Sequence, residues 1–336
     1  MIRIAHVEPE EYIGPLLELW NRNLEDRFPL DEKLLRQQLA LDSDEKILYA
    51  AFDCPKTQVP GRDEVMVGAT LVKRRHRQNP DGRIPALGNI SFILVDGTSR
   101  RHGTGTLLLA KAELWLRDRG VTRLDFGRDR YHFFPGCPQD GSPSSLSLEA
   151  FLLARGFILS GAESDLAADL GLLDLTALST NTPLPAGYRF IFYGPPLRAS
   201  LLAFFERNFP GRWLDDTFEA LDAGMRDKDL ALLVEESSGK IVGFARLYDT
   251  ASPILGPGVY WRALMGSTPG GLGPIGVDRD RRGLGLGLAF LRAALEELAH
   301  RGVRTCVIDW TDLEAFYAKM GFAVWKRYRM ASKESA

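Results

Sequence analysis

The stretch Val277-Asp278-Arg279-Asp280-Arg281-Arg282-Gly283-Leu284-Gly285-Leu286-Gly287 joins the end of an apolar segment to a basic, glycine-rich loop and the start of an apolar helix. Glycines remove the side chains that would keep a phosphate away from the backbone. The first N–H groups of a helix have no partner inside it, and its positive dipole end attracts anions, as does a nearby arginine. The stretch is therefore typical of a phosphate-binding loop between a strand and a helix.

The same pattern occurs earlier, between residues 95 and 105. Seven landmark residues of the first copy recur in the second copy 182 positions later, as Val95 does at Val277. The first set is Val95, Asp96, Arg100, Gly103, Gly105, Gly120 and Val121, and the second set is Val277, Asp278, Arg282, Gly285, Gly287, Gly302 and Val303. A second spacing of 165 positions relates Arg155-Gly156-Phe157 to Met320-Gly321-Phe322. The sequence thus predicts a duplicated domain whose first copy has about 17 extra residues, in the turn-rich segment around 132–145.

Length and composition agree with two soluble domains. A chain of 336 residues exceeds what one core usually serves. Apolar residues make up 45% and charged residues 26%, an ordinary globular mixture, and the net charge of -2 argues against nucleic acid as the main partner. No apolar run approaches the roughly 20 residues needed to span a bilayer, and no signal-peptide pattern opens the sequence. We therefore expect a cytoplasmic protein with no membrane partner.

The segment 176–187 has the Ser, Thr, Pro and Gly content of an exposed connector. It predicts an N-terminal domain of residues 1–175 and a C-terminal domain of residues 188–336. Cys54, Cys137 and Cys306 are isolated in the sequence, and no histidine has the spacing of a metal ligand. We expect reduced, packing cysteines and no metal site.

Hydrophobic periodicity gives a similar order of elements in both copies. In the first we expect strands at 2–4, 46–52, 64–72, 89–95 and 123–126, with helices at 12–20, 106–119 and 148–155. In the second we expect strands at 188–193, 230–235, 241–247, 272–277, 305–308 and 323–330, with helices at 197–207, 288–301 and 313–320. Strands outnumber helices and run partly in hairpins, which predicts an α+β fold: in each domain a mixed, mostly antiparallel sheet flanked by helices.

The pattern Arg-x-x-Gly-x-Gly between a strand and a helix resembles the coenzyme A loop of the GNAT (Gcn5-related N-acetyltransferase) superfamily. The resemblance implies two tandem GNAT-like domains that use acetyl-coenzyme A as co-substrate. It implies a pyrophosphate site at Arg282, Gly283, Gly285, Leu286 and Gly287, a pantetheine site along Ile275 and Val277, and equivalent roles for Val95, Arg100, Gly103 and Gly105. The alternative is a glycine-rich turn without a ligand. A dinucleotide fingerprint would need glycine at Leu288, and no P-loop pattern occurs.

Superfamily members commonly have a tyrosine in the helix before the last strands, where it returns a proton to the departing thiolate. The second copy has Tyr317 at this position, and the first copy has Leu152, which has no proton to give. The resemblance thus implies that the C-terminal copy is catalytic and that the N-terminal copy has a supporting role. The alternative for Tyr317 is a core tyrosine whose hydroxyl reaches the surface.

Candidates for the acceptor side follow the strand at 305–308. A carboxylate at Asp309 could orient an ammonium group or take its proton, and the indole of Trp310 could stack on a sugar ring. Helix capping is the alternative role for this segment. The phrase Phe-Pro-Gly occurs after His132 and before Arg212-Trp213, which makes those three residues further substrate candidates; turn formation and core packing are the alternative.

Three segments, 127–136, 208–211 and 309–317, resemble bacterial tandem acetyltransferases that act on glucosamine and glucosaminides. The resemblance implies direct acetyl transfer to a primary amine of a small acceptor, with an amino sugar as the expected acceptor. Mycothiol synthase is a neighbouring possibility. A non-catalytic acyl-coenzyme A sensor or scaffold is the alternative from another class, and a tyrosine retained in one copy only argues against it.

Overall fold

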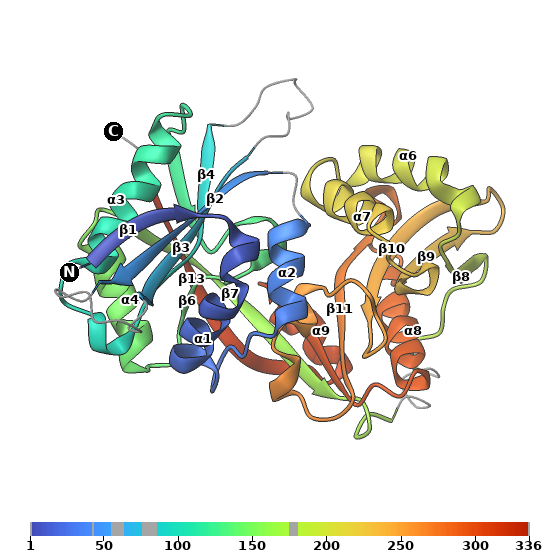
Figure 1. Cartoon of the computed structure of the whole chain (residues 1–336). Coiled ribbons are helices and arrows are strands. Elements are labelled where there is room, and N and C mark those ends of the chain that lie inside the picture. Colours follow the sequence, from blue (N-terminus) through green and yellow to red (C-terminus); the bar gives the residue numbers. More distant parts are fainter. Residues whose placement is uncertain (1, 42–43, 55–63, 76–85, 175–180, 335–336) are drawn as a thin grey trace. The chain divides into compact units, whose positions relative to one another are not determined.

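The computed structural model describes residues 2–41, 44–54, 64–75, 86–174 and 181–334 (Figure 1). The chain forms two compact units: unit 1 comprises Met1–Ala162 and Tyr328–Ala336, and unit 2 comprises Glu163–Arg327. These ranges do not coincide with the predicted domains 1–175 and 188–336. Part of the predicted connector lies outside the described residues.

Unit 1 holds the first copy of the repeat. Its elements are β1 (Ile2–Val7), η1 (Pro9–Tyr12), α1 (Ile13–Leu24), α2 (Glu32–Ala40), β2 (Glu45–Asp53), β3 (Val65–Arg74), β4 (Leu87–Val95), η2 (Gly97–Ser99), α3 (Thr104–Arg117), β5 (Arg123–Phe126), η3 (Arg130–His132), β6 (Cys137–Pro138) and α4 (Pro143–Leu153). The strand order is β1-β2-β3-β4-β5-β13, and β6 also pairs with β13. Strands β4 and β5 are parallel, and the other pairs given for this unit are antiparallel.

Unit 2 repeats this arrangement. Its elements are the end of β7 (Ile158–Asp169), β8 (Tyr188–Phe192), η4 (Pro195–Leu197), α6 (Arg198–Asn208), α7 (Arg212–Asp222), η5 (Asp227–Asp229), β9 (Leu230–Glu235), β10 (Lys240–Tyr248), η6 (Pro257–Val259), η7 (Arg262–Leu264), β11 (Pro269–Val277), η8 (Arg279–Arg281), α8 (Leu286–His300), β12 (Thr305–Thr311), α9 (Glu314–Tyr317), η9 (Ala318–Met320) and the start of β13 (Ala323–Glu334). The strand order is β7-β12-β11-β10-β9-β8, with only β11 and β12 parallel among the pairs described. The predicted α+β fold with mixed, mostly antiparallel sheets is confirmed.

The two copies exchange their last strands. Strands β7 and β13 are equivalent in the repeat, because both ends of one are 165 positions from those of the other. The end of β7 pairs with β12 in unit 2, and the end of β13 pairs with β5 in unit 1. Each sheet is therefore completed by the other copy's strand, which is why the units differ from the predicted ranges.

Helices cover both faces of each sheet, because successive strand residues point to opposite faces. In unit 1, Phe92 of β4 contacts Trp20 of α1 with ring centroids 5.3 Å apart, while the next residue, Ile93, packs on the cluster around Leu108 of α3. In unit 2, Phe244 of β10 contacts Phe205 of α6 at 4.5 Å. The α8 helix covers the opposite face of that sheet.

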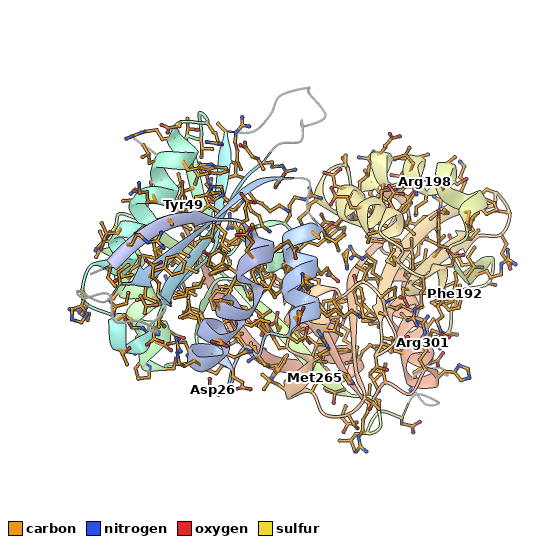
Figure 2. All side chains as sticks on the ribbon, in the orientation of Figure 1. Asp26, Tyr49, Phe192, Arg198, Met265 and Arg301 are labelled. Atoms are coloured by element: carbon orange, nitrogen blue, oxygen red, sulfur yellow. The ribbon has the colours of Figure 1, made fainter. Side chains whose placement is uncertain are left out.

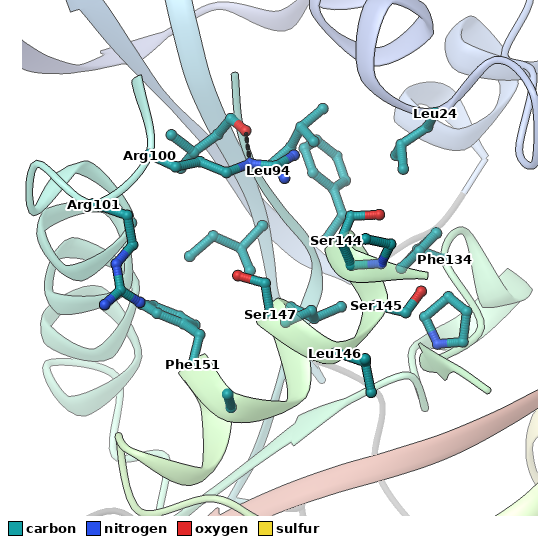
Figure 3. Close-up of a pocket in the computed structure, with 18 of the residues that line it drawn as sticks. Leu24, Leu94, Arg100, Arg101, Phe134, Ser144, Ser145, Leu146, Ser147 and Phe151 are labelled. Carbon is teal, nitrogen blue, oxygen red and sulfur yellow. Dashed lines mark hydrogen bonds between the residues drawn. The ribbon is translucent and has the colours of Figure 1, made fainter. Parts of the chain in front are cut away.

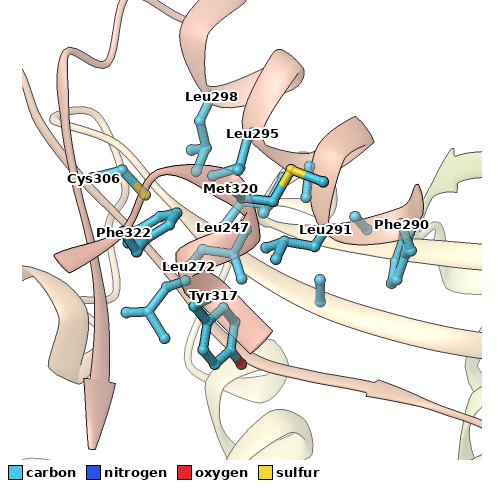
Figure 4. Close-up of a cluster of buried hydrophobic side chains, with 14 of the residues drawn as sticks. Leu247, Leu272, Phe290, Leu291, Leu295, Leu298, Cys306, Tyr317, Met320 and Phe322 are labelled. Atoms are coloured by element: carbon cyan, nitrogen blue, oxygen red, sulfur yellow. The ribbon is translucent and has the colours of Figure 1, made fainter. Parts of the chain in front are cut away.

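The core of unit 2 lies under α8 (Figure 4). Buried side chains of α8 recur on one face of the helix and pack against the sheet and against Tyr317, Met320 and Phe322. The members drawn from α8 include Phe290, Leu291, Leu295 and Leu298. Burying one such side chain contributes about 1.5–3 kcal/mol, so this face fixes the position of the helix.

Charges hold the C-terminal end of α8. Arg301 donates to Asp229 at 3.2 Å and to Asp249 at 3.3 Å, and its guanidinium lies 5.5 Å from the ring centroid of Phe192. Figure 2 labels Arg301 and Phe192 in this part of unit 2. A cation at a helix C-terminus is favourable. These contacts fix the C-terminal end of α8 and so contribute to the orientation of its glycine-rich N-terminal end.

Several elements differ from the sequence prediction. Helices α2 and α7 and strand β7 were not predicted; β7 has few β-branched residues, so pairing with its neighbour decides its conformation. Helix α4 starts at Pro143, before the predicted residue 148, because Ser142 accepts a hydrogen bond from the Ser145 N–H at 3.3 Å and proline suits the first turn. Among the helices described, none is long and apolar enough to cross a bilayer.

Candidate active site

Two parallel strands of unit 2 separate at the candidate site. Strands β11 and β12 pair only from Pro269–Gly271 to Thr305–Val307. Beyond that point β11 remains paired with β10 as far as Val277, with a register shift opposite Ala245 and Leu247. The other edge of β11 near Ile275 and Val277 is half-buried and has no ladder partner in the described sheet. Its amide groups can therefore pair with an extended ligand.

The glycine loop follows this edge directly. Gly283 and Gly285 have φ angles of 81° and 77°, which favour glycine, and a Cβ at either position would meet no atom within 4 Å. The first bond of α8 runs from the Ala289 N–H to the Gly285 carbonyl at 3.2 Å. The N–H groups of residues 286–288 have no acceptor within the helix and are available to a ligand, with Arg282 exposed beside them.

The loop is held by its own Asp278 and by Arg207 and Asn208 at the end of α6, contacts that the sequence did not predict. Asp278 accepts hydrogen bonds from the Asp280 N–H at 2.9 Å, from Arg207 at 2.5 Å and from Asn208 at 3.3 Å. In return, the Asn208 side-chain oxygen accepts the Arg279 N–H at 3.2 Å. The end of α6 thereby fixes the first turn of the loop.

Unit 1 contains the same contacts. Asp96 accepts from the Thr98 N–H at 3.0 Å and from Arg22 at 2.6 Å, while Asn23 accepts the Gly97 N–H at 3.0 Å. The signal was present in the sequence: the pair Arg-Asn occurs at 22–23 and at 207–208. The repeat therefore extends to the helix that supports each loop.

Asp309 lies where β11 and β12 separate. A Cβ at Gly273 of β11 would lie 3.3 Å from Oδ1 of Asp309, so the carboxylate faces the irregular part of that strand. Burial raises the pKa of Asp309 to about 6, although Arg212 and Arg246 act to lower it. At neutral pH this carboxylate is mainly ionised, and its raised pKa makes it a better base than an exposed one.

Tyr317 belongs to the core of unit 2, with its hydroxyl directed away from the aliphatic side chains (Figure 4). Its neighbour Phe316 faces the start of α8, where a Cβ at Gly287 would lie 3.8 Å from the Phe316 ring. Burial, and the nearby Asp309 carboxylate, raise the pKa of the Tyr317 phenol. The phenol therefore remains protonated at neutral pH and can act as a proton donor.

The backbone of Trp310 is held in an uncommon conformation. Its φ is 45°, in the left-handed region, and the β7–β12 register shifts between Ile308 and Thr311. Its N–H donates to the buried Asp165 of β7 at 2.9 Å. Next to Asp165, Ser164 donates to Glu314 of α9 at 2.7 Å. Strand β7 thus fixes both the segment of Asp309 and Trp310 and the helix of Tyr317.

Two arginines flank Asp309. Arg212, in the first turn of α7, lies 5.7 Å from the Trp310 ring centroid and 3.6 Å from Asp216. Arg246 of β10 is only 2% exposed and lies 5.6 Å from the ring centroid of Tyr248. The sequence analysis did not select Arg246, although an arginine within a buried apolar strand is unusual.

Unit 2 thus brings Asp309, Trp310, Arg212 and Tyr317 into one region. The other two substrate candidates are Trp213, which follows Arg212 on α7, and His132, which belongs to unit 1. Trp213 packs in an aromatic cluster, with ring centroids 5.0 Å from Phe209 and 5.7 Å from Phe244. His132 is 2% exposed in unit 1.

The first copy has the same separation of parallel strands and the same glycine loop, but other side chains at the positions of Asp309 and Tyr317. Strands β4 and β5 pair over Leu87–Ile90, and β4 then continues to Val95 and the loop of Gly103, whose φ is 85°. By the repeat, Gly127 stands where Asp309 does and Leu152 where Tyr317 does. A cleft of about 880 Å³ opens beside this loop (Figure 3).

The described residues indicate neither a cysteine nucleophile nor a metal centre. Cys306 is buried, and burial raises the pKa of its thiol. Cys54 and Cys137 form no disulfide in the described part of the chain. No group of histidine, cysteine or acidic side chains among the described residues could hold a metal ion.

Comparison with known proteins agrees with this geometry. Residues 198–322 match the model of the acetyltransferase (GNAT) family. A glucosamine N-acetyltransferase region of a fungal multi-domain GH3 β-N-acetylglucosaminidase is similar in structure, with 23% identity and a TM-score of 0.83. The match covers 99% of this chain and only 38% of that chain.

Two further structures are similar over nearly the whole chain. A tandem GNAT protein from the clavulanic acid biosynthesis pathway has 20% identity and a TM-score of 0.70, with 100% of this chain and 99% of that chain covered. A GCN5-related N-acetyltransferase from Sphaerobacter thermophilus has 20% identity and a TM-score of 0.65, with 99% and 95% covered. No curated protein matches the sequence. At these identities the similarity shows the fold.

Proposed function

We propose that unit 2, whose residues 198–322 match the model of the acetyltransferase (GNAT) family, transfers an acetyl group from acetyl-coenzyme A to a primary amine of a small acceptor. One observation carries the proposal. The glycine loop directly follows the unpaired edge of β11. The Asp309 carboxylate lies where β11 and β12 separate, and Tyr317 is nearby. This arrangement supports a single path that joins donor binding to the acid–base groups.

The donor would bind in an extended form. Its pyrophosphate would accept hydrogen bonds from the free N–H groups at the start of α8, and its pantetheine amides would pair with the open edge of β11. The thioester would then lie near Gly273, beside Asp309. An N–H group of this edge would stabilise the oxyanion formed on attack.

The transfer needs two proton movements. The amine nitrogen forms a bond to the thioester carbonyl carbon, and the carbon–sulfur bond breaks. Asp309 takes the proton that leaves the nitrogen, and Tyr317 gives a proton to the departing thiolate. The raised pKa of Asp309 suits a base, and the Tyr317 phenol is in its protonated form at neutral pH. No acyl-enzyme is needed, which agrees with the buried position of Cys306.

An amino sugar fits the residues on the acceptor side. The indole of Trp310 can stack on a sugar ring, while Asp309 binds the amine and Arg212 can donate to hydroxyl groups. The glucosamine N-acetyltransferase region of the fungal neighbour supports the same class of acceptor.

Release of free thiol from acetyl-coenzyme A tests the proposal. The panel contains glucosamine, glucosaminides, aminoglycosides, polyamines and peptide amines, with Tyr317→Phe as the matched control because it keeps the ring. We expect amine-dependent release to be highest with amino sugars. Release no faster than hydrolysis with every amine would overturn the proposed activity. Ping-pong kinetics, or an acetylated Cys306 in mass spectra, would overturn direct transfer.

A further inference from the structure

We propose that residues 207–213 of unit 2 position both substrates, because they hold the glycine loop at one end and place Arg212 on the acceptor side at the other. These residues join helices α6 and α7 (Figure 1), and we call them the bridge segment: Arg207-Asn208-Phe209-Pro210-Gly211-Arg212-Trp213. The inference rests on the proposed function, since it takes the loop as the coenzyme A site and Arg212 as an acceptor contact. It adds Asn208 as a positioning residue whose effect reaches the acceptor amine.

The first end of the bridge segment is Asn208, the last residue of α6. Its amide nitrogen donates to the Phe204 carbonyl at 3.1 Å and to Asp278 at 3.3 Å, and its oxygen accepts the Arg279 N–H at 3.2 Å. The first bond lies within the last turn of the helix, and the other two reach the start of the glycine loop. One side chain therefore fixes the end of α6 against the loop.

Aromatic packing holds the middle of the bridge segment on the sheet. Phe209 lies on β11 so closely that a Cβ at Gly276 would lie 2.6 Å from its ring. Trp213 packs against Phe209 at 5.0 Å and against Phe244 of β10 at 5.7 Å, centroid to centroid. Because such contacts leave little free space, a shift of the end of α6 moves the start of α7 as well.

The second end of the bridge segment reaches the acceptor side. Arg212 is the first residue of α7, and its guanidinium lies 5.7 Å from the ring centroid of Trp310. The same guanidinium lies 3.6 Å from the buried Asp216, one turn along the helix. The position of this cation is therefore set by the start of α7, and only three residues, 209–211, separate that start from Asn208.

Unit 1 repeats the first end of the bridge segment. The pattern Arg-Asn-x-x-x-Arg followed by an aromatic residue occurs at 22–28 and again, 185 positions later, at 207–213. Asn23 donates to the Leu19 carbonyl at 2.8 Å and accepts the Gly97 N–H at 3.0 Å. It thus connects its own helix to its own glycine loop in the same way.

The second end is repeated too. Arg27, the counterpart of Arg212, donates to Ser142 and to Ser144 at 2.6 Å each. These serines lie at the start of α4, which corresponds to α9 by the spacing of 165 positions, and in unit 2 Arg212 lies beside the residue Trp310 that precedes α9. Two copies with different side chains at the reaction centre keep both ends, which supports a role in placing one end relative to the other.

Asn208→Ala tests the bridge segment, and Asn23→Ala is its matched control in unit 1. Both substitutions remove the same kinds of hydrogen bond, so their effects on overall stability should be similar. We expect Asn208→Ala to raise the KM for acetyl-coenzyme A roughly five- to tenfold, because the loop loses two bonds. It should also raise the KM for the best amine of the panel roughly three- to fivefold, with kcat changed less than about twofold. Asn23→Ala should leave both KM values within about twofold of those of the unaltered protein.

Hydrogen exchange gives a result that does not depend on activity. Without ligand, Asn208→Ala should speed amide exchange in residues 209–216, because the start of α7 loses its fixed neighbour, and Asn23→Ala should leave this exchange unchanged. Unchanged exchange at 209–216 in Asn208→Ala would overturn the proposal. A rise in the KM for acetyl-coenzyme A with an unchanged KM for the amine would also overturn it, since Asn208 would then support the loop alone.

Exchanging two partners provides a rescue. Asn208→Asp combined with Asp278→Asn keeps one amide and one carboxylate in the pair, whereas each single substitution brings two like groups together. Both KM values should be closer to those of the unaltered protein in the double variant than in either single variant. Rescue of the KM for acetyl-coenzyme A alone would count against the bridge. Absence of amine-dependent thiol release in the unaltered protein would refute the proposed function, and hydrogen exchange would still decide whether the segment joins its two ends.

Discussion

Replacing Asp309 by asparagine should lower activity and raise stability at the same time. The carboxylate has a raised pKa because it is buried, so its ionised form is less stable in the folded protein than in water. Asparagine has nearly the same shape and no charge. The variant therefore removes a destabilising ion together with the proposed base.

The magnitude follows from the pKa of about 6 in the folded protein against 3.8 for the ordinary aspartate. A difference of about two pH units corresponds to about 3 kcal/mol at most, and the remaining exposure of the side chain reduces it to roughly 1–3 kcal/mol. An acid whose pKa is raised on folding stabilises the folded state below its unfolded pKa and loses this contribution as the pH rises through the folded pKa. The free energy of unfolding of the wild-type protein should therefore fall by this amount, relative to that of Asp309→Asn, between about pH 4 and pH 7.

Two measurements check the reasoning. Urea unfolding of both proteins at pH 4.5, 6 and 8 gives the difference in stability, which should grow with pH in favour of the variant. The kcat/KM of the wild-type protein should fall about tenfold per unit below pH 6, and this limb should be absent from the residual activity of the variant.

A constant loss of stability at all pH values in Asp309→Asn would refute the argument. That result would mean that the attraction of Arg212 and Arg246 outweighs the cost of burial. Unchanged turnover in the variant would remove Asp309 from the mechanism, whatever its effect on stability.

Tyr317→Phe should lower kcat by roughly 10²-fold and leave acetyl-coenzyme A binding unchanged, because only the proton donor is lost; steady-state kinetics and calorimetry check this, and full activity would contradict it. Gly287→Glu should abolish turnover, whereas its counterpart Gly105→Glu should reduce turnover much less; the reverse order in thiol-release assays would make the first copy the enzyme. Asp165→Ala should raise the KM for the amine and lower kcat, because the Trp310 N–H loses its acceptor. Asp165→Asn keeps an oxygen acceptor and should therefore have a KM and a kcat close to those of the wild-type protein. Equal effects of the two substitutions would assign another role to Asp165.

The sequence was sufficient for the fold class and for the repeat because their signals are local. Gly103 and Gly285 have positive φ angles that few other residues adopt, and each precedes a long helix with an apolar face. Because the pattern recurs 182 positions later, it predicted two such domains. The same reasoning correctly placed most strand centres, such as Arg123–Phe126 and Leu230–Glu235, which the structure contains with the predicted bounds.

The contacts around the site depend on tertiary structure and were not predictable in the same way. Equal spacing shows that β7 and β13 are equivalent, but it does not show which copy each of them joins. Asp165 and Ser164 are distant in sequence from Trp310 and Glu314, and their polar side chains resemble those of any exposed segment. The pairs at 22–23 and 207–208 carried a detectable signal, since they repeat, but an Arg-Asn dipeptide is too short to stand out alone.

The exchange of strands determines the order in which the polypeptide can finish folding on the ribosome. Strand β5 of unit 1 needs Ala331–Glu334 as its neighbour, and these residues are synthesised after all of unit 2. Until they emerge, the nascent first copy has an unpaired sheet edge, which is prone to aggregation. Truncation before Ala331 should accordingly damage the N-terminal copy. If the two halves are expressed separately, the N-terminal half carries β7, which unit 2 requires, and the C-terminal half carries the end of β13, which unit 1 requires.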